Sequence, residues 1–118
     1  MEYLKNEKKM ELYKLKEKVT IGKLNNALLV ELEKIGLICK VVNGKEYVMT
    51  ITSTNDGKHM KKSLHYKDRA IDIRTRDMEP ANRILTQIYL KRWLGVNFDV
   101  ILESDHIHIE HDPKNLLT

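Results

Sequence analysis

The first regular pattern in the chain is a set of apolar residues at helical spacing. Leu24, Leu28 and Leu32 recur every four positions, and Gly36 follows where a helix commonly stops. We therefore predict a core-facing helix over residues 23–35. The lone cysteine lies in the apolar run that comes next, at Cys39, where a thiol is typical of a small core residue rather than of a nucleophile.

A second helical pattern follows the helix-start signal of residues 77–80. It begins with the start signal of Pro80 and carries a broad apolar stripe that ends at Gly95. Tyr89 and Trp93 belong to this stripe. We therefore predict that both aromatic side chains lie in the core rather than in a binding surface.

Strand patterns account for most of the remaining chain. Residues 47–52 are rich in strand-forming side chains, and residues 70–74 alternate between apolar and polar positions. Residues 98–103 and 106–111 form two further short runs, joined by the turn pair Ser104-Asp105. The last two runs are therefore predicted to form a hairpin.

Together these elements predict one α+β domain over residues 1–118, with a small, mostly antiparallel sheet and helices on one face. Residues 1–20 are rich in Lys and Glu, and we expect a surface helix or arm without chemistry there. The polar stretch 53–63 has the composition of a long loop, and such loops often carry function.

Composition narrows the function classes. The 118 residues carry a formal net charge of +4, and 42% of them are hydrophobic, which suffices for one core without disulfides. No concentrated basic stripe interleaved with exposed aromatics indicates a nucleic-acid partner, and no apolar run indicates a stable membrane association. The N-terminal residues lack the apolar stretch of a signal peptide, so we expect synthesis in the cytoplasm. We also expect a monomer.

The candidate chemistry lies on the two strands near the C-terminus and on the strand at 70–74. Strand alternation places His106, His108 and Glu110 on one face, and a two-residue turn places Glu103 opposite His106 on that same face. Asp72 adds a carboxylate in mid-strand, and an imidazole precedes it at His65. Two imidazoles with one carboxylate have the composition of a catalytic zinc site, which keeps its fourth position for water. We therefore predict a zinc site on the open face of the sheet. A neighbouring carboxylate, Glu103 or Asp105, would act as the general base.

These residues also fall into two spaced motifs of a known superfamily. Residues 63–72 read SLHYKDRAID and resemble its Ser-x-His-x-x-Gly-x-Ala-x-Asp motif, while His106 and His108 are similar to its His-x-His motif. The superfamily unites D-alanyl-D-alanine metallopeptidases, lysostaphin-type peptidases and hedgehog domains. The resemblance extends from residue 47 to residue 113, and residues 56–72 are most like the hedgehog and phage-endolysin branches.

The resemblance implies roles for individual residues. His65, Asp72 and His108 would bind Zn²⁺, and His106 would assist near the oxyanion. His59, Ser63 and Arg69 would lie beside the metal or contact the substrate. The resemblance leaves two candidates for the catalytic acidic residue. Peptidases of the group often place it three residues before the ligand histidine, which corresponds to Asp105. Hedgehog-like chains place it on the preceding strand, which corresponds to Glu103. The hairpin phase favours Glu103.

Two departures from the family pattern bear on these roles. The motif glycine is replaced by Asp68, which is tolerable because aspartate enters the left-handed region more readily than most residues. The arginine that holds a substrate carboxylate in many carboxypeptidase relatives has no clear counterpart, although Arg69, Arg74 or the lysines at positions 58, 61 and 62 could substitute.

The implied activity is hydrolysis of a peptide bond in peptidoglycan stem peptides, either L-alanyl-D-glutamate or D-alanyl-D-alanine. A phage or prophage lytic enzyme that reaches the cell wall through a membrane lesion fits this activity. The alternative is a non-enzymatic, hedgehog-like zinc module that binds a protein partner. An open zinc position with an intact acidic base would favour the enzyme, and a protein group in the fourth position would favour the module.

Overall fold

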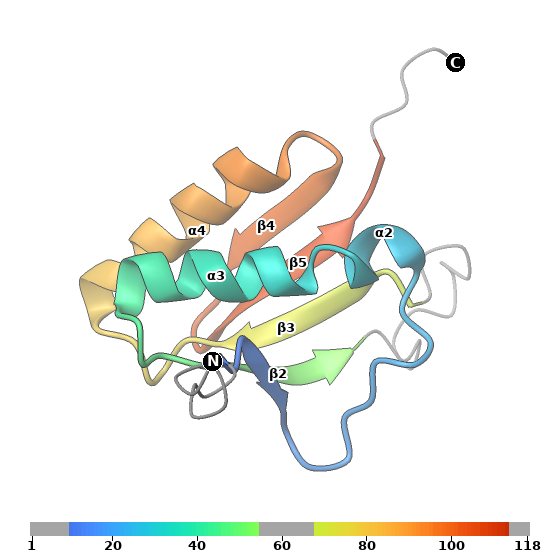
Figure 1. Cartoon of the computed structure of the whole chain (residues 1–118). Helices are drawn as coiled ribbons and strands as arrows, with labels where there is room; N and C mark the ends of the chain where they lie inside the picture. Colours follow the sequence, from blue (N-terminus) through green and yellow to red (C-terminus); the bar gives the residue numbers. More distant parts are fainter. Residues whose placement is uncertain (1–9, 55–67, 114–118) are drawn as a thin grey trace, which may run out of the picture.

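A computed structural model describes residues 10–54 and 68–113 of the chain. These residues form a five-stranded sheet in the order β1-β2-β3-β5-β4, with helices on one face (Figure 1). Strand β1 runs parallel to β2, and the other neighbours are antiparallel. The elements are β1 (Tyr13–Leu15), α2 (Asn26–Leu29), α3 (Leu32–Asn43), β2 (Met49–Thr54), β3 (Ala70–Arg74), α4 (Pro80–Leu94), β4 (Phe98–Leu102) and β5 (His106–His111). The predicted α+β architecture is confirmed.

The core lies between the sheet and the helices, and alternating isoleucines build its sheet side. Cross-strand pairing sets Ile71 against Ile109 and Ile73 against Ile107, and all four are at most 1% exposed. Burying an isoleucine side chain contributes about 1.5–3 kcal/mol. The residues between these isoleucines therefore point to the opposite, open face of the sheet.

Helix α3 differs from the prediction of a helix that stops at Gly36. The predicted helix is divided into the short α2 and α3, and α3 continues through Gly36 to Asn43. The glycine is required by packing rather than by termination, because a Cβ atom there would collide with the backbone oxygen of Leu12. The segment before β1 therefore lies directly against the helix backbone.

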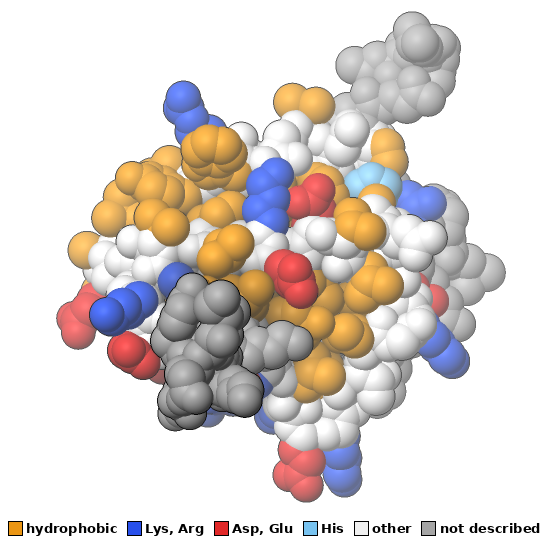
Figure 2. All heavy atoms as spheres, viewed as in Figure 1, with side chains coloured by type: hydrophobic (Ala, Val, Ile, Leu, Met, Phe, Trp, Pro, Cys, Tyr) orange, Lys and Arg blue, Asp and Glu red, His pale blue; other side chains and the backbone are white. Residues whose placement is uncertain are grey.

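Helix α4 lies where its start signal and Gly95 predict a helix, but it has a different inward face. Its buried residues are Thr86, Leu90 and Leu94, whereas Tyr89 is 39% exposed and Trp93 is 58% exposed. The prediction that both aromatics lie in the core is therefore wrong. Figure 2 shows the resulting hydrophobic surface over this helix. No helix in the described part of the chain is long and apolar enough to cross a membrane.

The inward face of α4 is set by its contact with α3. The side-chain amide of Asn43 donates hydrogen bonds to the backbone oxygen of Cys39, at 2.9 Å, and to the hydroxyl of Thr86, at 3.2 Å. Thr86, although polar, can therefore lie on the buried face of α4, and the wider apolar stripe of this helix then faces outward. Cys39 itself is fully buried, as predicted, and burial raises the pKa of its thiol to about 12.

The start of the described chain forms β1 rather than the predicted surface helix or arm. Tyr13 pairs with Met49 and Leu15 with Ile51, so this short strand extends the sheet beside β2. Tyr13 also packs against the core. Residues 13–15 are therefore part of the folded domain.

The close approach at Gly36 gives a stability prediction. Gly36→Ala should lower the free energy of unfolding by about 1–3 kcal/mol, because the added methyl group forces the Leu12 backbone away from α3. Urea denaturation followed by circular dichroism measures this change. Gly22→Ala is the matched control, since a Cβ atom at Gly22 would meet nothing within 4 Å. Equal losses in the two variants would contradict the packing role of Gly36.

Candidate metal centre

The candidate centre is built on the open face of the sheet by the pairing of β3 with β5. Asp72 lies opposite His108, Arg74 lies opposite His106, and Ala70 lies opposite Glu110. The residues that alternate with them are the buried isoleucines of the core. The same register that closes the core therefore brings a carboxylate and two imidazoles together on the other face.

His108 is held between two carboxylates. Its Nδ1 lies 2.8 Å from Oδ1 of Asp72, and its Nε2 lies 3.0 Å from Oε1 of Glu110. The hydrogen bond to Asp72 raises the pKa of His108 to about 9; burial opposes this rise and Glu110 adds to it. Positive charge is therefore strongly favoured at this point of the sheet.

His106 is oriented by its neighbour in the turn. Its Nδ1 lies 2.8 Å from Oδ1 of the exposed Asp105, and its Nε2 lies 3.8 Å from Oδ2 of Asp72. The contact with His106 holds the pKa of Asp105 below its usual range. The carboxylate of Asp105 thus fixes the imidazole and leaves Nε2 on the side of Asp72.

Glu103 closes the β4–β5 hairpin on the opposite strand. Its backbone N–H donates to the backbone oxygen of His106 at 2.8 Å, next to the pair Leu102 and Ile107. Leu102 packs against the core, so alternation directs Glu103 to the open face that carries His106. The turn geometry is the one that the sequence predicted.

The start of β3 is fixed by Asp68, the residue that replaces the motif glycine. Its φ angle is 66°, in the left-handed region that glycine adopts most readily. Its backbone oxygen accepts a hydrogen bond from the N–H of Asn25 at 2.8 Å. The Asn25 side chain in turn lies 3.1 Å from Nδ1 of His111 at the end of β5. Asn25 thus ties the beginning of β3 to the end of its partner strand.

Three of the predicted site residues, His59, Ser63 and His65, lie outside the described residues. Arg69 lies at the end of β3 remote from Arg74, where its backbone oxygen accepts from the N–H of His111 at 2.9 Å. The structure therefore brings together Asp72, His106 and His108, with Asp105 and Glu103 at the hairpin end. Their roles stay predictions.

Glu110 is the neighbour that the sequence reasoning did not assign to the site. Period-two alternation predicts that Glu110 lies on the same face as His106 and His108, and this pattern is the sequence signal that could have assigned Glu110 to the site. The contact itself, 3.0 Å from Nε2 of His108, depends on side-chain conformation and could not be obtained from spacing.

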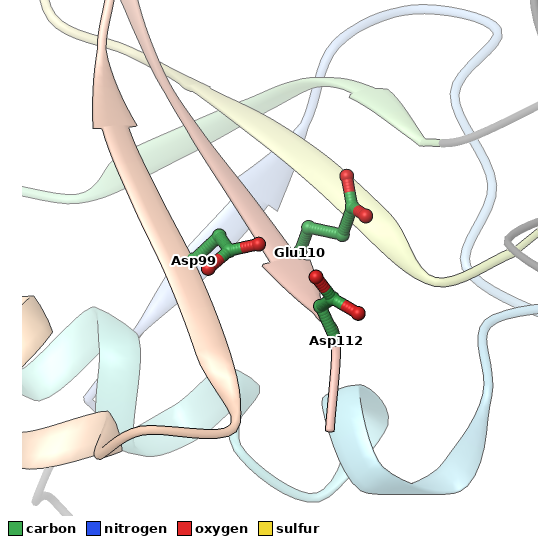
Figure 3. A group of neighbouring side chains, drawn as sticks. All are labelled: Asp99, Glu110 and Asp112. Atoms are coloured by element: carbon green, nitrogen blue, oxygen red, sulfur yellow. The ribbon is translucent and has the colours of Figure 1, made fainter. Parts of the chain in front are cut away.

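Glu110 also belongs to an acidic group at the far end of the face. Figure 3 shows Asp99 on β4, Glu110 on β5 and Asp112 just beyond it; one carboxylate oxygen of each lies within 4.8 Å of the others. Exposed acidic groups of this kind are common without a bound ion. The group by itself therefore defines no metal site.

The donors of the central pair fit a zinc ion. Asp72 supplies a carboxylate oxygen and His108 an imidazole nitrogen, the two ligand types that catalytic zinc sites combine. Their donor atoms are direct neighbours, and the surrounding carboxylates favour positive charge. A divalent cation would therefore meet both suitable ligands and a favourable field at this position.

The fold and the paired groups define a small α+β domain of the zinc-peptidase-like class. The chain belongs to the family of the Hedgehog amino-terminal signalling domain, whose family model matches residues 4–110. This family is part of the zinc-peptidase-like superfamily, and its fold binds zinc. No curated protein and no solved structure matches the chain.

The left-handed backbone at Asp68 gives a prediction about the start of β3. Asp68→Val should lower the free energy of unfolding by about 1–2 kcal/mol, because a β-branched residue is strained at a φ of 66°. Asp68→Gly should stay within about 1 kcal/mol of the wild type. Chemical denaturation measures both. Asp99→Val, the same exchange within strand β4, is the matched control. A wild-type stability of Asp68→Val would contradict the strain argument.

Proposed function

We propose that this chain is a zinc-dependent peptidase that hydrolyses peptide bonds in peptidoglycan stem peptides. The observation that carries this proposal is the direct pairing of Asp72 with His108 on the open face of the sheet, with His106 beside them. Membership of a family in the zinc-peptidase-like superfamily supports it. The proposed substrate bond is L-alanyl-D-glutamate or D-alanyl-D-alanine, as the motif resemblance implies.

Asp72 and His108 would hold the metal, with His65 as the third ligand implied by the motif. Bound zinc would lower the pKa of a water molecule toward ~7 and polarise the substrate carbonyl. The negative field of Asp72 and Glu110 around His108 would help to retain a cation. Glu110 would then orient the imidazole of His108 through Nε2, as carboxylates beside zinc-binding histidines commonly do.

The remaining residues would handle protons. Glu103, at the end of the hairpin, would take a proton from the attacking water and deliver it to the leaving amine. His106 would donate from Nε2 to the carbonyl oxygen as negative charge develops there. Asp105 would accept from Nδ1 of His106 and hold the ring, and the imidazolium form of His106 would carry the second donor proton on Nε2. Because Asp105 is engaged in this contact, Glu103 is the better candidate for the base.

The second candidate is a non-enzymatic zinc module that binds a protein partner. The family match favours it, because the matching family is named for a signalling domain. Both functions need the same metal ligands, so metal binding does not separate them. Only hydrolysis requires Glu103 as a proton carrier.

The ligand assignment predicts which residues zinc requires. Asp72→Ala and His108→Ala should each weaken zinc binding by more than about 100-fold, because loss of a ligand should exceed the 10- to 100-fold effect of losing a supporting group. Metal analysis and titration with a competing chelator measure the loss. His111→Ala is the control, since His111 lies on β5 but contacts Asn25 and Phe98. Full zinc retention in Asp72→Ala or His108→Ala would refute the assignment.

The role of Glu103 predicts a separation of activity from metal binding. Glu103→Gln should lower hydrolysis of purified peptidoglycan by about 10²- to 10⁴-fold while zinc stays bound, because the amide keeps the size and loses the basicity. Mass analysis of the released fragments follows the reaction and identifies the bond.

Asp105→Asn is the matched variant, and we expect a smaller loss because it would disturb only the orientation of His106. An inactive Asp105→Asn beside a fully active Glu103→Gln would move the base to Asp105. A zinc-loaded wild type that cleaves no cell-wall preparation would favour the partner-binding module.

A further inference from the structure

Helix α4 presents an apolar stripe on its outward face. Five large side chains of this stripe have exposed fractions between 39% and 58%: Ile84, Leu85, Ile88, Tyr89 and Trp93. Residues four positions apart are neighbours along a helix, so the five side chains form one continuous surface. Figure 2 shows hydrophobic side chains gathered over this helix. Contiguous apolar surfaces on small domains commonly mark a site of interaction.

Two cations lie on the same outward face. Lys91 and Arg92 are exposed in the last turn of the helix. Arg92 follows Ile88 by four residues and Lys91 follows Ile84 by seven, which are the spacings of residues on one helix face. No residue from 80 to 94 is acidic. The outward face of α4 is therefore both apolar and positively charged.

This combination fits the surface of a bilayer that contains anionic lipids. Tyrosine and tryptophan favour the boundary between headgroups and acyl chains, because each joins an apolar ring to a polar group. Lysine and arginine next to such an apolar face attract anionic headgroups. We propose that the outward face of α4 docks on an anionic membrane surface, with the helix axis along the membrane plane. The proposal is independent of the peptidase function.

The charge of the face distinguishes a bilayer from a second copy of the chain. An interface between two copies would have to bury Lys91 and Arg92 on a face whose helix supplies no carboxylate, which is costly. A bilayer leaves the charged ends of these side chains in the hydrated headgroup layer while their stems lie deeper. Docking of this kind differs from the expectation of no stable membrane association, which did not include the outward position of Tyr89 and Trp93.

The layers of the domain determine what such docking leaves free. Helix α4 covers one face of the sheet, whereas Asp72 and His108 lie on the opposite, open face (Figure 1). A domain that lies on the membrane through α4 therefore holds the candidate metal centre away from the bilayer.

The test measures binding of the full chain to lipid vesicles by co-sedimentation. Vesicles of phosphatidylcholine with about 30% phosphatidylglycerol are compared with vesicles of phosphatidylcholine alone. We expect about 10- to 30-fold stronger binding to the anionic vesicles, because two cations approach the charged surface. This preference should weaken in high salt. Equal binding to both kinds of vesicle, or binding to neither, would overturn the proposal.

Trp93 reports which surface of the protein meets the vesicle, because it is the only tryptophan of the chain. Its fluorescence should shift to shorter wavelength on anionic vesicles and should be quenched by lipids with brominated acyl chains. An unchanged emission from protein that sediments with the vesicles would mean that another surface binds, and would overturn the proposal.

A double substitution tests the apolar part of the contact. Ile84→Gln combined with Ile88→Gln should weaken vesicle binding by at least about 10-fold, because two side chains lose their apolar contact with lipid. These residues are 55% and 50% exposed, so the core stays intact, which circular dichroism checks. Val30→Gln, at the end of α2 and 73% exposed, is the control and should bind like the wild type. Unchanged binding of the double variant would refute the role of α4.

A second double substitution tests the charged part. Lys91→Gln combined with Arg92→Gln should remove the preference for anionic vesicles. Lys14→Gln combined with Lys23→Gln removes the same charge from β1 and from the segment before α2, and should keep the preference. Equal losses in the two variants would mean that net charge, and not this face, attracts the lipid.

Other occupants of the face would give different results. A dimer in analytical ultracentrifugation that dissociates on substitution of Ile84 and Ile88, in a protein that binds no vesicles, would assign the face to a second copy. Poly-L-glutamate that shifts the emission of Trp93 as far as anionic vesicles do would indicate an acidic protein partner. Either result would overturn the lipid surface.

Discussion

The register between β3 and β5 is the constraint on which the domain depends, because every residue of these strands faces either the core or the site. Ile71 and Ile73 meet Ile109 and Ile107 on the helix side, and Asp72 meets His108 on the other. A shift by one residue would place the polar groups in the core and the isoleucines in water. The burial of the isoleucines therefore also fixes the distance between the groups that carry the proposed chemistry.

Local polar contacts secure this register at both ends of the strand pair. At one end, Asp68 in a left-handed conformation accepts from Asn25, whose side chain lies beside His111. At the other end, the N–H of Thr75 donates to the backbone oxygen of Asp105, and the carboxylate of Asp105 contacts the imidazole of His106. The groups of the candidate site thus lie between two strand ends that are held by hydrogen bonds, which suits a site that must keep charged groups at fixed spacing.

The parts of the fold that depend on neighbours in sequence were predictable. Alternation located the strand at residues 70–74 and the final hairpin, and the signals at Pro80 and Gly95 located α4. Because the hairpin turn is short, its register followed from the sequence as well. Alternation along each strand also predicted that Asp72 and His108 lie on the face opposite to the isoleucines. That the two residues lie directly opposite each other could not be predicted, because it depends on the pairing of two strands that are distant in sequence.

The incorrect predictions share a different physical origin. Gly36 has the usual appearance of a helix stop, but the backbone of Leu12, more than twenty residues earlier, occupies the space that a side chain would need. The inward face of α4 passes through Thr86, whose partner Asn43 lies on another helix. In each case a tertiary contact outweighs a local preference, and single-sequence periodicity contains no information about such contacts.

The short strand β1 has a consequence for how the domain behaves in solution. It covers one edge of β2 and is itself only three residues long, with Lys14 in its centre and Lys16 directly after it. Brief, positively charged edges of this kind resist pairing with strands of other molecules. A truncation that removed β1 would expose the backbone N–H and C=O groups of a six-residue strand instead, and would make intermolecular sheet growth the main route to aggregation.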